Sequence, residues 1–344
     1  MKPPYFSQPS RSFWASSLQG RGLAEIDFND FYRKKFDLAG APTASAGACF
    51  AQCMVPLLKK NGFNYLEVET TGARRSSEES AALHYDEFSA RYGQVQTSRQ
   101  LLQLLQRALG LLKPEDKAWP RGTGVVDPFR PNISPKPYST EAEMTADRQR
   151  HLEKVLELFE KTEVFFFTLT QTEAWESRLD GAVFPIVPGL LTGGVWDPAK
   201  YRFRNLRYAD VMEDMGSFLA LSRQLNPRIS LVLTVSPVYL VSTAGDEHIL
   251  AADAYSKSVL RAAAGDLYRD REEVDYYPAW EMTAGLAGGG RFYDPTGRNL
   301  SAEGVAWAME VFFKTHSPAG AERAADLKMP ADEELFLASL GKSE

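Results

Sequence analysis

The stretch Glu163-Val-Phe-Phe-Phe-Thr-Leu169 has the strongest strand character in the chain. It is short, continuously apolar in its middle and rich in aromatic residues, as expected of a strand that is buried on both faces. Arg228-Ile-Ser-Leu-Val-Leu-Thr-Val-Ser236 has the same character and stops at Pro237. Such strands are typical of parallel sheets, because helices cover both faces of those sheets. These two stretches therefore predict an α/β fold.

Strand-like and helix-like segments alternate on both sides of these two stretches. Shorter strands are predicted at 43–47, 64–69 and 274–278. A helix that follows the first strand ends at Asn61-Gly62. Apolar residues at helical spacing, together with end signals such as Ser301 as an N-cap, predict further helices at 98–112, 140–162, 208–225, 252–269 and 301–313. This alternation predicts a parallel sheet with helices on either side.

The chain is expected to form one domain over residues 1–316, followed by a helical or disordered tail over 317–344. Within the domain, region 76–131 departs from the alternation, because loops rich in Pro, Gly and Trp surround its one good helix. We interpret region 76–131 as an inserted helical and loop region that covers the site.

The composition is that of an ordinary folded protein, with 44% hydrophobic and 24% charged residues among 344. A formal net charge of −6 argues against nucleic acid as a partner. No run approaches the ~18 apolar residues of a membrane helix, and residues 1–14 contain no apolar signal-peptide core. We therefore expect a cytoplasmic protein without a transmembrane segment. Two cysteines without clustered histidines make a poor zinc site, so no metal is expected.

The carboxyl ends of the predicted strands are where chemistry is expected, because parallel sheets bind ligands there. Cys49 follows the first strand and starts a helix, where the positive end of the helix dipole favours a thiolate. A thiolate at this position is suited to nucleophilic acyl transfer. The alternative is a small buried hydrophobe, which is what most free cysteines are. Cys53, one turn further along, is assigned to the core.

Polar residues also follow the two strongest strands. Thr170, Thr172 and Glu173 are candidates to orient a substrate or to stabilise a developing oxyanion. The alternative is a helix N-cap, since Thr172 followed by Glu173 is common at helix starts. Trp175 could stack on a sugar ring, although core packing explains it equally well. Ser236, at the end of its strand, joins Trp175 among the candidate substrate-binding residues.

A cysteine nucleophile needs a base, and histidine is the usual choice near neutral pH. His248 is the only one of four histidines in a loop that follows a central strand, although most loop histidines are simply solvated. His84 lies in the inserted region and could come close. Lys257 could bind an anionic group or remain solvated. Gly93 could let a backbone N–H approach a substrate or serve only in a turn.

The stretch Gly47-Ala-Cys-Phe-Ala51 resembles the hallmark Gly-Ser-Cys-Phe-Ala of the GSCFA family, with Ala48 in place of the serine. Several longer stretches, in the order the family has them, extend this resemblance from about residue 13 to about residue 313. They are Arg91-Tyr-Gly-Gln-Val-Gln-Thr-Ser-Arg-Gln-Leu-Leu102, Asp127-Pro-Phe-Arg-Pro131, Phe167-Thr-Leu-Thr-Gln-Thr-Glu-Ala-Trp175, Leu233-Thr-Val-Ser-Pro-Val238 and Tyr255-Ser-Lys-Ser-Val-Leu-Arg261.

This family in turn resembles the SGNH/GDSL hydrolases, which implies a flavodoxin-like, three-layer α/β/α sandwich. The resemblance places Cys49 at the position of the nucleophile and Gly93 at that of a backbone oxyanion donor. Residues 170–173 would match the Gly-x-Asn-Asp block. The family's usual assignment is to polysaccharide biosynthesis, and acyl or acetyl transfer follows as the natural inference.

Two departures from the SGNH pattern concern the chemistry directly. Thr172 stands where SGNH enzymes have an oxyanion Asn, and Thr296-Gly-Arg-Asn299 stands in place of the Asp-x-x-His block. Asn299 cannot act as a general base, which leaves it as a candidate substrate-binding residue. Either His248 supplies the base from a neighbouring strand end, or the protein has lost hydrolytic chemistry.

Two hypotheses from different classes follow. The first is an acyltransferase or esterase that uses Cys49 on a carbohydrate or polysaccharide precursor, with acetyl-CoA as a possible donor and no bound cofactor. The second is a catalytically silent SGNH-like module that binds a glycan or a partner protein, and the missing Asp-x-x-His block favours it. A redox pair of Cys49 and Cys53 is the weakest alternative, because the spacing is not Cys-x-x-Cys.

Overall fold

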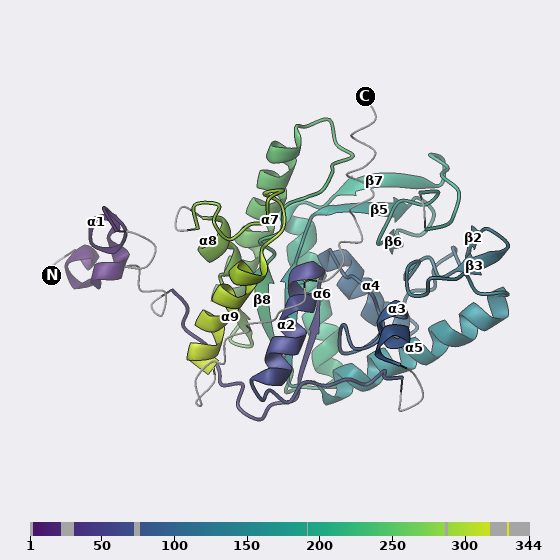
Figure 1. Cartoon of the computed structure of the whole chain (residues 1–344), viewed down its shortest axis with the longest axis horizontal. Helices are drawn as coiled ribbons and strands as arrows, with labels where there is room; N and C mark the ends of the chain where they lie inside the picture. The colour runs from purple at the N-terminus through teal and green to yellow at the C-terminus, as the bar shows by residue number, and fades with distance from the viewer. Residues whose placement is uncertain are drawn as a thin grey trace.

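The computed structural model describes residues 3–21, 31–71, 76–190, 192–285, 288–316 and Met329. At its centre lies a four-stranded parallel sheet in the order β1-β4-β8-β9 (Figure 1). The strands are β1 (Thr43–Ala46), β4 (Val164–Leu169), β8 (Ser230–Val235) and β9 (Val274–Tyr276). The predicted α/β protein with a parallel sheet is therefore confirmed.

The central strand β4 is apolar on both faces, which explains its uninterrupted hydrophobic sequence. Phe165, Phe167 and Leu169 belong to one apolar cluster, whereas Val164 and Phe166 belong to a second cluster on the other face. Successive side chains of a strand point to opposite faces. Both faces of the sheet are therefore buried, as the sequence predicts.

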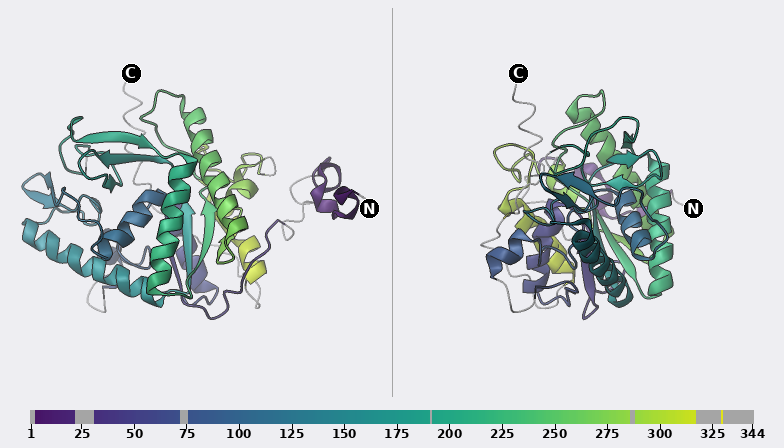
Figure 2. Two further views of the ribbon diagram at one scale, coloured as in Figure 1. Left: turned by 180° about the vertical axis from the view of Figure 1, so that it is seen from behind. Right: turned by 90° about the vertical axis from the view of Figure 1, so that its right-hand side faces the viewer.

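Helices supply the rest of both clusters. Apolar residues of α4, α5, α6 and α7 join the cluster of Phe165, and most of those of α2 and α9 join that of Phe166. In Figure 1 α2 and α9 lie toward the viewer, whereas α6 and α7 do so in the left view of Figure 2. The helices are α2 (Cys49–Lys60), α3 (Ser77–Ala82), α4 (Ser98–Ala108), α5 (Glu141–Lys161), α6 (Tyr208–Leu225), α7 (Ile249–Asp270), α8 (Ala279–Ala284) and α9 (Ala302–His316).

The predicted strand at 64–69 forms only a single parallel bridge, in which Tyr65 pairs with Thr43 of β1. Thr43 N–H donates to the carbonyl of Asn64 at 2.8 Å, and Leu66 N–H donates to that of Thr43 at 2.8 Å. Further along β1, the N–H of Ser45 donates instead to the hydroxyl of Ser89 at 3.2 Å. The ladder stops because the Ser89 side chain occupies the position that a longer strand would need.

Two small antiparallel sheets and a short N-terminal helical segment complete the described chain. Residue 173 begins a strand, so the alternative that interprets Thr172-Glu173 as a helix start is wrong. The additional elements are η1 (Pro4–Ser7), η2 (Ser10–Ser12), α1 (Trp14–Ser17), β2 (Trp119–Arg121), β3 (Gly124–Val126), β5 (Glu173–Ser177), β6 (Val183–Phe184) and β7 (Tyr201–Asn205).

The ends of the predicted helices agree with the structure to within a few residues. Ser301 caps α9 as predicted, since its hydroxyl accepts the N–H of Gly304 at 3.1 Å. Within region 76–131, α4 packs its leucines into the cluster of Phe165. No helix among the described residues is long and apolar enough to cross a membrane. The predicted tail at 317–344 lies outside the described residues, apart from Met329.

Gly47 lets the start of α2 approach β4 closely. A Cβ atom at this position would lie 2.7 Å from the Cβ of Ala51 and 2.8 Å from that of Thr168. Neither neighbour is the end of a flexible side chain, so the helix and the strand would have to separate. Since Gly47 directly precedes Ala48 and Cys49, this contact also fixes where the thiol lies.

We predict that Gly47→Ala lowers the free energy of unfolding by about 1–3 kcal/mol, because overpacking strains a well-packed core. Urea unfolding followed by circular dichroism measures the change. Gly216→Ala is the matched control, because nothing lies within 4 Å of its new Cβ in α6. That control should be neutral or stabilise the protein by about 0.5–1 kcal/mol. An unchanged unfolding midpoint for Gly47→Ala would contradict the prediction.

Candidate functional site

Cys49 lies just beyond the carboxyl end of β1 and is the first residue of α2. Its thiol is partly exposed, whereas Cys53 is buried in the second apolar cluster. Burial raises the pKa of the Cys53 thiol to about 12. The assignment of Cys53 to the core is therefore confirmed, and Cys49 is the more accessible of the two thiols.

The loop that contains Gly93 runs beside Cys49. Val95 N–H donates to the carbonyl of Gly47 at 2.9 Å, and Nε2 of Gln94 lies 3.9 Å from Sγ of Cys49. Gly93 has a φ of +67° and faces open space where a Cβ would stand. Within the described ranges, the N–H groups of Gly93 and Gln94 donate to no acceptor. Two backbone donors beside the thiol are thus available to a ligand.

A cavity of about 240 Å³ opens beside this loop. Its walls come from the loops that follow β4 and β8, from the Gly93 loop, and from the small sheet that contains β5. Amide side chains dominate the polar part of the lining, and aromatic rings form much of the rest. The lining residues include His84, Gly93, Gln94, Gln96, Gln100, Phe129, Arg130, Gln171, Glu173, Trp175, Phe184, Thr243 and Ala244.

Three of the predicted site residues line this cavity, namely Gly93, Glu173 and Trp175. Glu173 is nearly buried, and its carboxylate accepts the hydroxyl of Thr243 at 2.6 Å and the N–H of Ala244 at 3.3 Å. Burial raises the pKa of Glu173, although these two hydrogen bonds act in the opposite direction. Trp175 extends from β5, edge-on to Trp196 at a centroid distance of 5.3 Å.

Three other predicted residues hold the loop that leads into β5. The buried ammonium of Lys257 donates to the carbonyl of Thr170 at 2.7 Å. Thr172 is also buried, and its N–H donates to the hydroxyl of Ser256 at 3.0 Å. The Thr172 hydroxyl donates to Oδ1 of Asn205 at 2.6 Å. These contacts are typical of side chains that fix a loop in place.

The remaining predicted residues lie in other loops at the edge of the sheet. His248 is exposed and caps α7, because its Nδ1 accepts the N–H of Leu250 at 3.2 Å. Ser236 is buried, and its hydroxyl accepts the N–H of Val238 at 3.2 Å. Oδ1 of Asn299 accepts a hydrogen bond from its neighbour Arg298 at 3.1 Å.

His84 lines the cavity, although sequence reasoning gave it no role beyond its possible proximity. Its Nδ1 lies 2.9 Å from Oε2 of Glu87. The only sequence signal for this pair is the spacing of three residues within a loop-rich region. Because no strand directly precedes His84, the rule that favours strand ends did not select it.

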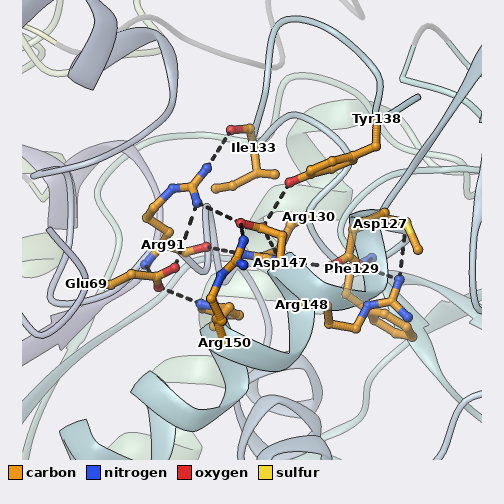
Figure 3. Close-up of polar contacts among 12 residues, drawn as sticks. Glu69, Arg91, Asp127, Phe129, Arg130, Ile133, Tyr138, Asp147, Arg148 and Arg150 are labelled. Carbon is orange, nitrogen blue, oxygen red and sulfur yellow. Dashed lines mark hydrogen bonds and ion pairs between the residues drawn. The ribbon is translucent and has the colours of Figure 1, made fainter. Parts of the chain in front are cut away.

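A buried ion cluster includes Arg91, which precedes Gly93 by two residues (Figure 3). Arg130 is almost completely buried and binds Asp127 at 3.1 Å and Asp147 at 3.0 Å. Arg148 binds the other oxygen of Asp127 at 3.0 Å, and Arg91 lies 3.5 Å from Asp147. Removing one partner from such a buried pair leaves an uncompensated charge, so the cluster is costly to disrupt.

The cluster fixes the backbone of Arg91 from both sides. Its N–H donates to the carboxylate of Glu69 at 2.8 Å, and its carbonyl accepts Nη1 of Arg130 at 3.3 Å. Gly93 follows two residues later, so these contacts help to orient its backbone. The stretches Arg91–Leu102 and Asp127–Pro131, quoted above only for the family resemblance, meet in this cluster.

The charges of the cluster shift the pKa values of its members. Burial alone would raise the pKa of Asp127, but Arg130, Arg148 and Arg107 hold it well below its usual value. His151, on α5, donates to Glu69 at 2.7 Å and is completely buried. Burial lowers its pKa from 6.5 to about 4, with Arg130 acting in the same direction and Glu69 opposing.

These features define an α/β protein whose candidate site lies at the carboxyl edge of a parallel sheet, around a cysteine at the start of a helix. The sequence profile of the GSCFA family matches residues 42–312, and the chain belongs to this family. No curated protein and no solved structure shows significant similarity to the chain. Among the residues that the structure describes, no group of three His, Cys, Asp or Glu side chains is placed to hold a metal ion.

We predict that His151→Gln flattens part of the pH dependence of stability. Because the pKa of His151 in the folded protein, about 4, is below its ordinary value of 6.5, the unfolded chain binds more protons between these values. The stability that His151 contributes is present above pH 6.5 and is lost as pH falls through about 4. Relative to His151→Gln, the unchanged protein should lose about 3 kcal/mol over this range.

Urea unfolding at pH 7, 5.5 and 4.5 measures the difference between the two proteins. His316 also has a pKa lowered to about 4 by burial, but it is present in both and cancels. His248→Gln, at an exposed position, is the matched control and should follow the unchanged protein. If the free energy of unfolding changed with pH equally in His151→Gln and in the unchanged protein, the prediction would be contradicted.

Proposed function

We propose that this protein is an acyltransferase or esterase that uses Cys49 to transfer or remove an O-acyl group, in the simplest case acetyl, on a carbohydrate or polysaccharide precursor. One observation carries the proposal. Cys49, partly exposed at a helix start, lies 3.9 Å from Gln94, which lines a cavity together with Gly93, and the backbone N–H groups of Gly93 and Gln94 have no protein acceptor in the described ranges.

The strand order supports an SGNH-like, flavodoxin-like arrangement of three α/β/α layers. The segment that forms the bridge at Tyr65 lies at the edge of the sheet, beside β1. If this segment is counted as the second strand in the chain, and β4, β8 and β9 as the third to fifth, the order across the sheet is 2-1-3-4-5. This is the order of the flavodoxin-like sheets, which bind ligands beyond the carboxyl ends of their strands. Cys49, directly after the first strand, then occupies the position that the nucleophile has in SGNH hydrolases.

The chemistry needs a nucleophile and an oxyanion site close together. The Cys49 thiolate attacks the carbonyl carbon of the ester, and the oxyanion accepts hydrogen bonds from the N–H groups of Gly93 and Gln94. Collapse of this intermediate expels the sugar alkoxide from an O-acyl sugar, or the CoA thiolate from acetyl-CoA. The leaving group takes up a proton, and an acyl thioester remains on Cys49. An acceptor hydroxyl then attacks the thioester in a transferase, or water does so in an esterase.

The cavity suits an uncharged, hydroxyl-rich group. Four glutamines line it, Gln94, Gln96, Gln100 and Gln171, and each amide can both donate and accept hydrogen bonds. Trp175 adds an aromatic ring of the kind that packs against sugars. A volume of about 240 Å³ admits a single acylated sugar unit. We propose acetyl-CoA as the donor of a transferase, with only its thioester end inside the cavity.

A silent glycan-binding module remains the second candidate, because Asn299 replaces the histidine of the SGNH pattern and is bonded to Arg298. The same cavity would serve both functions. The two candidates differ in the reactivity of Cys49. A nucleophile reacts faster than an ordinary thiol near neutral pH, whereas a binding module has no need of a reactive thiol.

We predict that incubation with an activated acetyl ester or with acetyl-CoA produces an acetyl adduct on Cys49. Intact-mass and peptide mass spectrometry measure it in the unchanged protein and in Cys49→Ser and Cys53→Ser. The adduct should disappear in Cys49→Ser and persist in Cys53→Ser, because Cys53 is buried with a raised pKa. An adduct that persists in Cys49→Ser, or no adduct together with a slowly alkylated Cys49, would contradict the proposal.

A further inference from the structure

We infer that His84, oriented by Glu87, is the general base that serves Cys49. This inference rests on the proposed function and supplies the proton acceptor that the missing Asp-x-x-His block leaves open. His84 lines the cavity, with 20% of its side chain exposed. Its Nδ1 lies 2.9 Å from the Glu87 carboxylate, so Nδ1 carries the hydrogen and Nε2 is the unprotonated nitrogen of the neutral ring.

Two independent contacts connect this pair to Cys49. Oε2 of Glu87 also accepts Nε2 of Gln52 at 3.1 Å. Gln52 is three residues after Cys49 on α2, and residues at this spacing are neighbours on a helix surface. On the other side, Gln94 lines the same cavity as His84 and lies 3.9 Å from the Cys49 sulfur. The pair of His84 and Glu87 is thus linked to Cys49 through Gln52 on one side and through Gln94 on the other.

The backbone around His84 is held in an unusual conformation. His84 has a φ of +56° and Asp86 a φ of +66°, which residues with side chains rarely adopt. Such conformations persist where the surrounding structure enforces them, and they concentrate at functional sites. Here the strained turn directs a histidine into the cavity and places Glu87, three residues later, against its ring.

Arg91 holds this turn from both sides of His84. Its Nε donates to the carbonyl of Leu83 at 2.9 Å, and its guanidinium lies 4.2 Å from the ring centroid of Tyr85. The same arginine belongs to the buried ion cluster and precedes Gly93 by two residues. Arg91 therefore helps to position both the proposed base and the proposed oxyanion donors. Its side chain holds the turn of His84, and its backbone lies two residues before Gly93.

His248, the candidate from the sequence, has a different environment. It is exposed, and its Nδ1 accepts a backbone N–H as the cap of α7. No carboxylate contact to His248 is present within the described residues. A base needs a third group to orient its ring, as the general logic of catalytic triads requires. The geometry satisfies this requirement for His84.

The proton then follows a balanced path. Nε2 of His84 accepts the thiol proton of Cys49 as sulfur attacks the carbonyl of the ester or of acetyl-CoA. It returns that proton to the departing sugar oxygen or CoA sulfur. In the second half of the reaction the same nitrogen accepts a proton from the acceptor hydroxyl or from water, while the oxygen attacks the thioester. The proton returns to sulfur when the thiolate leaves, and Glu87 stabilises the transient imidazolium throughout.

The test is the pH dependence of Cys49 alkylation by iodoacetamide, resolved from Cys53 by peptide mass spectrometry. His84→Asn is the main variant, because asparagine tolerates a positive φ but cannot act as a base. Its alkylation rate at pH 7 should fall by about tenfold, and the pH midpoint should move toward the ~8.5 of an ordinary thiol. Glu87→Gln, which retains the shape of the side chain, should give a smaller change in the same direction.

His248→Gln is the matched control and should leave the alkylation profile and the acetylation of Cys49 unchanged. Circular dichroism and unfolding midpoints check that each variant is folded. One result overturns the inference and leaves the proposed function standing: Cys49 is alkylated rapidly and becomes acetylated, but His84→Asn does not change the pH profile of its alkylation. Loss of the rapid alkylation in His248→Gln would overturn the inference in the same way. If Cys49 of the unchanged protein alkylates like an ordinary thiol and gains no acetyl group, the proposed function itself fails.

Discussion

The buried contacts of Arg91 connect the sheet, the helices and the candidate site. Its backbone is fixed between Glu69 and Arg130, and its guanidinium reaches Asp147 and the carbonyl of Leu83. Burying charges in this way is costly unless they are paired and hydrogen-bonded. The free energy of that pairing, together with α5, which carries Asp147, helps to hold the two loops that meet at Arg91 and Arg130. Through these loops the cluster determines where the cavity wall stands.

The central part of the fold could be predicted from local sequence. β4 and β8 are continuous apolar runs, and the helices that follow them have regular apolar spacing. Each of these elements can therefore be predicted from its own sequence. The strand at 64–69 could not be corrected from sequence, because the hydroxyl of Ser89 ends the ladder from a position outside the strand. The Ser89 hydroxyl takes the hydrogen bond of the Ser45 N–H that a longer strand would need. The hydrophobic pattern of neither segment indicates this contact.

The candidate site could be predicted only in part, for a related reason. The strand-to-helix transition identified Cys49, and the same rule led to Glu173, whereas Gly93 was a candidate only as a glycine whose backbone N–H could approach a substrate. The rule says which loops gather at the edge of a sheet, but it does not say where a side chain points. His248 directs its ring to the start of α7, whereas His84 is placed in the cavity by a strained turn. A turn of that kind depends on distant partners such as Arg91.

The electrostatics of the cavity bear on what it can accept. Arg130 lines the cavity, but Asp127 and Asp147 already balance its charge. Burial raises the pKa of Glu173, and the same desolvation disfavours any further negative charge in this space. The remaining polar lining is dominated by neutral amides, which exchange hydrogen bonds with hydroxyl and carbonyl groups at little desolvation cost. A lining of this kind discriminates by hydrogen bonding, so the proposed substrate, a neutral ester of a sugar, matches it better than a carboxylate or a phosphate would.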